Sequence, residues 1–83
     1  MINASASQRL GKHVADTLAA KERSKLWLAG KTGIPYSTLG RKLLGRTTEF
    51  TFSDLLAIAD ALEVTPAALI PSDLQSVFVG NAA

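Results

Sequence analysis

Residues 24–45, S-K-L-W-L-A-G-K-T-G-I-P-Y-S-T-L-G-R-K-L-L-G, decide the fold of this 83-residue chain. Ser24 is a favourable N-cap, because its hydroxyl can accept a hydrogen bond from an early backbone N–H of a helix. Gly33 stands where a left-handed residue commonly ends a helix, and Pro35 is tolerated as the first residue of the next one. The pattern therefore predicts two short helices joined by a tight turn, over residues 25–32 and 35–44.

The two faces of the second predicted helix differ in chemistry. Leu39 and Leu43 are four residues apart and share one side, which we expect to face the core. Ser37 and Arg41 point the opposite way. In a helix-turn-helix, the second helix enters the DNA major groove while the first crosses the sugar–phosphate backbone. This arrangement predicts base contacts from the outward and N-terminal side chains of the helix, namely Tyr36, Ser37, Thr38 and Arg41.

Arg41 is the strongest base-reading candidate, because a guanidinium can bind O6 and N7 of guanine with two hydrogen bonds. The hydroxyls of Ser37 and Thr38 suit a base or a phosphate, and capping of their own helix is the structural alternative. Gly40 keeps the outward surface low, so that the helix can lie deep in a groove.

Amphipathic patterns on both sides of this stretch predict the rest of a helical domain. A first helix is expected from its cap Ser7 to Ala20, with apolar residues at every fourth position. Thr51 and Asp54 have the spacing of a capping box and open a fourth helix. The apolar stripes of these two helices are Leu10, Val14 and Leu18, and Leu55, Ile58, Ala59 and Leu62.

The C-terminal part of the chain is less regular. Thr65 followed by Pro66 predicts a fifth helix over residues 66–70. Residues 72–83 leave two interpretations open: a sixth short helix that residues 72–74 would open, or a strand over residues 75–79.

The basic residues are unevenly distributed along the chain. Nine of them against two acidic residues give residues 1–46 a formal charge of +7, whereas residues 47–83 carry −5. This asymmetry favours a cationic face for a polyanion such as a nucleic acid, and an uneven solvated surface is the alternative. The basic residues are Arg9, Lys12, Lys21, Arg23, Lys25, Lys31, Arg41, Lys42 and Arg46.

The chain resembles the phage Cro and lambda-repressor-like helix-turn-helix family. The resemblance rests on two blocks in this order: Ser24, Leu28-Ala29, Thr32-Gly33-Ile34, Ser37-Thr38-Leu39, Arg41 and Leu44-Gly45, then Phe52, Leu55, Ile58-Ala59, Ala61-Leu62, Val64 and Leu69. It implies an all-α, five-helix, lambda-repressor-like DNA-binding domain over residues 7–70, with the helix-turn-helix at its second and third helices. Residues 71–83 would then be a tail and a candidate dimerisation element.

The resemblance also implies contacts with the DNA backbone. Lys25, at the start of the second helix, and Arg46, just after the third, are the implied phosphate contacts. Lys42 is a further phosphate candidate, with a solvated charge as its alternative. Pro35 departs from the family, which has Ser or Thr there. Apolar residues also replace polar ones at two positions, where they either enlarge the core or form a contact patch, Leu26 and Trp27.

Several functions are disfavoured by what the sequence lacks. With no cysteine and with His13 as its single histidine, the chain is expected to hold no metal ion. No nucleophile–base pair and no phosphate-binding Gly-rich loop stands out, so we expect no enzyme activity, no cofactor and no small-molecule ligand. No apolar run reaches membrane-spanning length, and the N-terminus lacks a signal-peptide pattern, so we expect a cytoplasmic protein without a membrane partner.

We therefore predict a single domain, residues 1–83, that binds a double-stranded DNA operator in a sequence-specific manner. The expected role is transcriptional regulation as a Cro-like repressor and homodimer, because one recognition helix buries too little surface for tight specific binding. An antitoxin or accessory DNA-binding factor with the same fold is one alternative. A protein-interaction module that uses Leu26, Trp27 and the apolar tail is the other.

Overall fold

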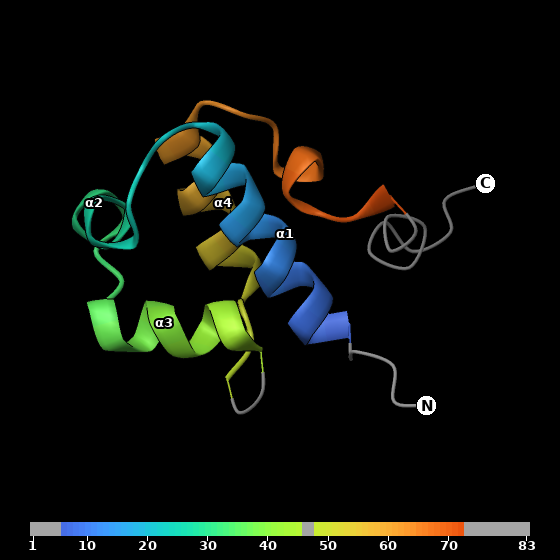
Figure 1. The fold of residues 1–83 in the computed structure, drawn as a ribbon, viewed down its shortest axis with the longest axis horizontal. Coiled ribbons are helices and arrows are strands. Elements are labelled where there is room, and N and C mark those ends of the chain that lie inside the picture. Colours follow the sequence, from blue (N-terminus) through green and yellow to red (C-terminus); the bar gives the residue numbers. More distant parts are fainter. Residues whose placement is uncertain (1–5, 46–47, 73–83) are drawn as a thin grey trace.

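The computed structural model describes residues 6–45 and 48–72, and the regular structure within these ranges is entirely helical (Figure 1). The elements are α1 (Ala6–Ala20), α2 (Lys25–Thr32), α3 (Tyr36–Leu44), α4 (Phe52–Leu62) and the 3-10 helix η1 (Pro66–Leu69). The predicted all-α class is confirmed. The count of five α-helices is not, because the fifth element in the described part of the chain is a short 3-10 helix.

The turn between α2 and α3 depends on the residues that end α2. The Ser24 hydroxyl accepts a hydrogen bond from the Trp27 N–H at 3.0 Å and caps the start of the helix. Gly33 ends it with a φ of 80°, and its N–H donates to the Ala29 carbonyl at 2.9 Å. Glycine suits this position because it adopts positive φ without a steric penalty. The predicted start and end of α2 are confirmed.

Two predicted helix starts are wrong, by one residue for α3 and by two for α1. Pro35 is the N-cap of α3 and not its first residue, because its ψ of 142° is extended. Its carbonyl nevertheless accepts the first helical hydrogen bond, from the Leu39 N–H at 2.8 Å. α1 begins at Ala6, so Ser7 lies inside the first turn and is not the cap. The Ser7 backbone lies directly against Gly45, which holds this turn on the end of α3.

The start of α4 is confirmed in detail. Thr51 Oγ1 accepts from the Asp54 N–H at 3.0 Å, and the Asp54 carboxylate accepts from the Thr51 N–H at 2.8 Å, so both halves of the capping box form. The Thr65 side chain, by contrast, accepts no hydrogen bond from η1. The turn of η1 is closed by the backbone instead, with the Ala68 N–H donating to the Thr65 carbonyl at 3.0 Å.

The apolar faces of all five elements meet in one core. α1 crosses α3 and touches η1, while α4 packs against α2 and η1 (Figure 1). Leu10 and Leu43, both predicted to be core residues, lie at its partly buried edge. The buried apolar side chains are Val14, Leu18, Leu28, Ala29, Leu39, Leu55, Ile58, Ala59, Leu62, Leu69 and Ile70.

The predicted tail, residues 71–83, lies almost wholly outside the described residues, which end at Ser72. The strand considered for residues 75–79 lies outside them as well. Among the helices that the structure describes, none combines the length and apolar character needed to cross a membrane.

Candidate nucleic-acid interface

α3 presents two chemically distinct faces. Leu39 is completely buried in the core, whereas Tyr36, Ser37 and Arg41 are exposed to solvent. Thr38 is half-buried on one flank of the exposed face. The predicted division between inward and outward side chains is confirmed, and the predicted base-reading residues share the outer part of one helix.

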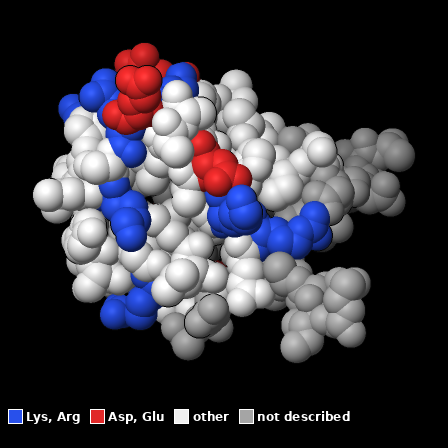
Figure 2. Space-filling view, viewed as in Figure 1, with Lys and Arg blue, Asp and Glu red and all other residues white. Residues whose placement is uncertain are grey.

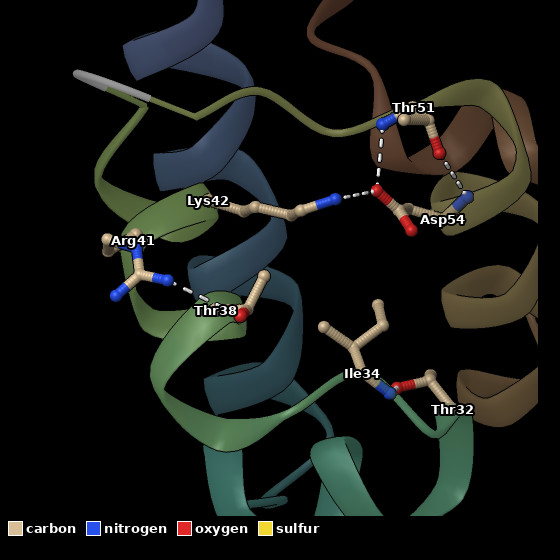
Figure 3. Close-up of polar contacts among 7 residues, drawn as sticks. All are labelled: Thr32, Ile34, Thr38, Arg41, Lys42, Thr51 and Asp54. Atoms are coloured by element: carbon tan, nitrogen blue, oxygen red, sulfur yellow. Dashed lines mark hydrogen bonds and ion pairs between the residues drawn. The ribbon is translucent and has the colours of Figure 1, made fainter.

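The Arg41 guanidinium lies along the outer surface of α3. Its Nη2 donates to Thr38 Oγ1 at 3.5 Å, which is long for a hydrogen bond and therefore weak. Because a guanidinium has five N–H donors, this contact leaves most of them available to an acceptor outside the protein. Figure 3 shows Arg41 and Lys42 extending in different directions from α3. Arg41 can therefore reach a ligand without breaking a strong internal bond.

A groove of about 600 Å³ lies beside this face, between α1 and α3. Ser37, Gly40 and Arg41 line it from α3, and Lys25 lines it from the start of α2. Arg23 adds a further cation that the sequence analysis did not single out, although its place one residue before the cap of α2 was a signal. Cations at the edge suit the phosphates of a nucleic-acid strand. The apolar part of the lining comes from Ala15, Leu18, Ala19, Leu43 and Leu44.

Charge on this side of the molecule favours an anionic ligand. In Figure 2, Lys and Arg side chains surround the face formed by α1 and α3, and acidic side chains are confined to two small areas. One of the cations, Lys12, is paired with Asp16 at 3.1 Å in an exposed bridge within α1. Exposed pairs of this kind contribute little to stability.

Lys42 does not share the exposed position of Lys25. Its ammonium forms an ion pair with Asp54 at the start of α4, and its side chain is only 11% exposed. Arg46, the third predicted phosphate contact, lies outside the described residues. The structure therefore places Lys25 in the surface groove and pairs Lys42 with Asp54, and the phosphate contact of Lys42 stays a prediction.

Asp54 joins α3 to α4. Its Oδ2 accepts hydrogen bonds from both the Lys42 ammonium and the Thr51 N–H (Figure 3). Burial by itself would raise the pKa of Asp54, but the hydrogen bonds from Lys42 and Thr51, with the lysine charge, lower that pKa below its ordinary value of 3.8. The carboxylate is consequently ionised at neutral pH, and the contact is a true ion pair.

Leu26 and Trp27 have different surroundings. Trp27 packs at the edge of the core, with the Arg23 guanidinium 4.6 Å and the Lys31 ammonium 5.9 Å from its ring centroid. Both distances are typical of cation–π contacts. Leu26 is 68% exposed. Core packing therefore explains Trp27, and it does not explain Leu26.

His13 has a structural partner on a distant part of the chain. Its Nε2 lies 2.9 Å from the carbonyl oxygen of Ala68. Because a carbonyl can only accept, Nε2 carries the hydrogen and donates it, which joins α1 to η1. The described residues contain no group of three side chains that could hold a metal ion.

The helical bundle, the tight turn between α2 and α3 and the cationic groove beside α3 define a helix-turn-helix DNA-binding protein. Residues 14–71 match the Cro/C1-type HTH DNA-binding domain, and the chain belongs to that family. The crystal structure of the restriction-modification controller protein C.AhdI from Aeromonas hydrophila is similar, with a TM-score of 0.71 and 25% sequence identity over 76% of this chain and 94% of that one. A comparison with curated proteins gives no match. The family resemblance predicted from the sequence is confirmed.

Proposed function

We propose that the chain is a sequence-specific transcriptional repressor of the Cro-like kind, acting in the cytoplasm as a homodimer on a double-stranded operator. The observation that supports this best is the exposure of Ser37 and Arg41 on α3, with Lys25 lining the same groove. In this proposal α3 enters the major groove and the start of α2 meets the sugar–phosphate backbone. The protein acts by binding alone, without catalysis or a cofactor.

Base contacts and phosphate contacts have separate tasks in this proposal. Arg41 binds a guanine edge, and Tyr36, Ser37 and Thr38 contact neighbouring bases, which gives sequence preference. Lys25 and Arg46 bind phosphates, which gives most of the affinity and makes it sensitive to salt.

A homodimer supplies the second half of the binding site. α3 has nine residues, about 14 Å at 1.5 Å per residue, so one copy spans only a few base pairs. Two copies related by a two-fold axis would place their α3 helices in successive turns of the major groove, about 34 Å apart. We assign the contact between copies to η1 and residues 71–83.

Selection from a random duplex library tests the proposal. The enriched sequence should contain two half-sites about 10 base pairs apart. Fluorescence anisotropy with that duplex should show log K falling by about 0.9 per contacted phosphate for each log unit of salt. If no sequence is enriched, operator recognition is wrong. An affinity that does not change with salt concentration would instead favour a protein-interaction module.

A second candidate follows from the likeness to C.AhdI, which is a restriction-modification controller protein. The groove chemistry would be the same, and the regulated genes would differ. Mapping the enriched sequence onto the source genome separates the two candidates. Operators beside restriction or modification genes favour the controller role, and operators elsewhere favour the Cro-like role.

A further inference from the structure

α3 is held on two flanks by contacts that do not belong to its outward face. On one flank its Leu43 backbone lies against Gly11 of α1, and on the other Lys42 is paired with Asp54 of α4. We propose that Lys42 and Asp54 are positioning residues, which fix the orientation of α3 and thereby determine how well the protein distinguishes one DNA sequence from another. This inference rests on the proposed operator binding.

The anchor for Lys42 is partly buried and held by several hydrogen bonds. The side chains of Lys42 and Asp54 are only 11% and 16% exposed. The same Asp54 oxygen that binds the ammonium also accepts the Thr51 N–H at 2.8 Å, and the Asp54 N–H donates to Thr51 Oγ1 at 3.0 Å. The carboxylate is thus held at the first turn of α4 by contacts that do not involve Lys42, so the ion pair ties the orientation of α3 to that of α4.

Lys42 is the chain neighbour of Arg41, and successive side chains of a helix project about 100° apart. Figure 3 shows Lys42 reaching Asp54 while Arg41 extends elsewhere. A helix with its side chains has a radius of about 5–6 Å, so a rotation of roughly 10° displaces a side-chain tip by about 1 Å. Recognition side chains must be held within about 0.5 Å and 10–20° of their productive geometry. Loss of the pair would therefore misplace Arg41 and Ser37 without altering either.

A direct phosphate contact by Lys42 is the competing explanation, and the two differ in what they require of Asp54. If Lys42 binds phosphate, Asp54 only competes for it, and its neutralisation should leave DNA binding unchanged or tighten it. If the pair positions α3, neutralisation of Asp54 should weaken discrimination as much as loss of Lys42 does. Asp54→Asn is a fair probe, because an amide oxygen can still accept the Thr51 N–H.

The experiment uses the full chain and measures the ratio of Kd values for a scrambled duplex and the selected operator, at several salt concentrations. The variants are Lys42→Met, Asp54→Asn and the two combined. The matched controls are Lys12→Met and Asp16→Asn, which remove the same charges from the exposed Lys12–Asp16 pair. We expect each single variant to lower the ratio about tenfold, the double variant to be no worse than either, and the salt slope to stay the same. The controls should leave the ratio unchanged.

Asp54→Glu covers the case in which a neutral variant does not fold, because it keeps both the charge and a good capping residue while displacing the carboxylate by one methylene. It too should lower the ratio. Retention of the wild-type ratio by Asp54→Asn or Asp54→Glu would overturn the positioning role. So would a Lys42→Met variant that weakens both duplexes equally and reduces the salt slope by about 0.9. If the wild-type chain bound the scrambled duplex and the selected operator with equal Kd values, the proposed function would be wrong. That result differs from a test in which the wild type discriminates and the variants keep its ratio.

Discussion

Gly11 of α1 lies directly against the backbone carbonyl of Leu43 near the end of α3. A Cβ built on Gly11 would collide with that carbonyl oxygen and lie 2.7 Å from its carbon atom. Both neighbours are main-chain atoms of packed helices, so neither can move aside cheaply. The absence of a side chain at Gly11 is thus what allows α1 and α3 to approach so closely.

Gly11→Ala should consequently destabilise the protein. Overpacking of this kind typically costs about 1–3 kcal/mol, which outweighs the gain in helix propensity from alanine. Gly30→Ala is the matched control, because Gly30 is also helical but a Cβ there meets nothing within 4 Å. Urea unfolding should show a lower midpoint for the first variant and a higher one for the second, and equal midpoints would contradict the close approach.

Gly40→Ala should separate stability from DNA binding. A Cβ on Gly40 meets no atom within 4 Å, so alanine should stabilise α3 by about 0.5–1 kcal/mol. Gly40 also lines the groove between α1 and α3, and the added methyl would occupy space that the DNA needs. The expected result is a higher Tm with weaker operator binding by anisotropy. Gly30→Ala should raise Tm without changing operator affinity. Unchanged affinity in both variants would show that DNA does not bind in this groove.

Stability should depend on acid through Asp54. The pKa of this carboxyl is lowered in the folded protein, so its ionised form stabilises the fold above the ordinary value of 3.8. That contribution is lost as the pH falls through the lower folded-state pKa. Asp54→Asn should therefore be less stable than wild type at neutral pH and approach it in strong acid. Urea titrations at several pH values measure this convergence, and Asp16→Asn serves as the exposed control.

Arg41→Ala and Lys25→Ala should affect binding in different ways. Loss of a bidentate guanine contact costs about 1–3 kcal/mol and relaxes preference at one base pair. Loss of a phosphate contact should weaken binding to all sequences about equally and reduce the salt slope by about 1. Binding to a set of operator variants at two salt concentrations distinguishes the two patterns. If the Arg41→Ala variant keeps the wild-type base preference, Arg41 is not a base-reading residue.

Helical periodicity was sufficient to predict which sides of α3 face the core and the solvent. Leu39 is buried and Ser37 and Arg41 are exposed because a 3.6-residue repeat fixes these directions from the sequence alone. The capping signals of Ser24 and Thr51 were equally reliable, since each depends on residues within one turn. The predicted start of α3 was wrong by one residue because the fixed φ of Pro35 suits both an N-cap and a first helical residue. The local sequence does not distinguish these two positions.

The pairing of Lys42 with Asp54 could not be predicted from helical periodicity. Its position on α3 indicates a flank, but its partner Asp54 lies twelve residues later on a separate helix. Asp54 was recognised as half of a capping box, and nothing in that local pattern indicates that one of its oxygens accepts a second hydrogen bond. The place of Arg23 in the groove lining could not be predicted for a related reason. The relative placement of α1, α2 and α3 determines which cations line the groove.

The hydrogen bond from His13 to the Ala68 carbonyl closes the domain on itself, since it joins residues 55 positions apart. η1 lies beside α1 (Figure 1), and Leu69 of η1 is completely buried. A fragment trimmed after α4 would uncover that side of the core and leave the imidazole without its acceptor. The smallest independently folding unit must therefore extend through η1, although α2 and α3, the helices proposed to meet DNA, end well before it.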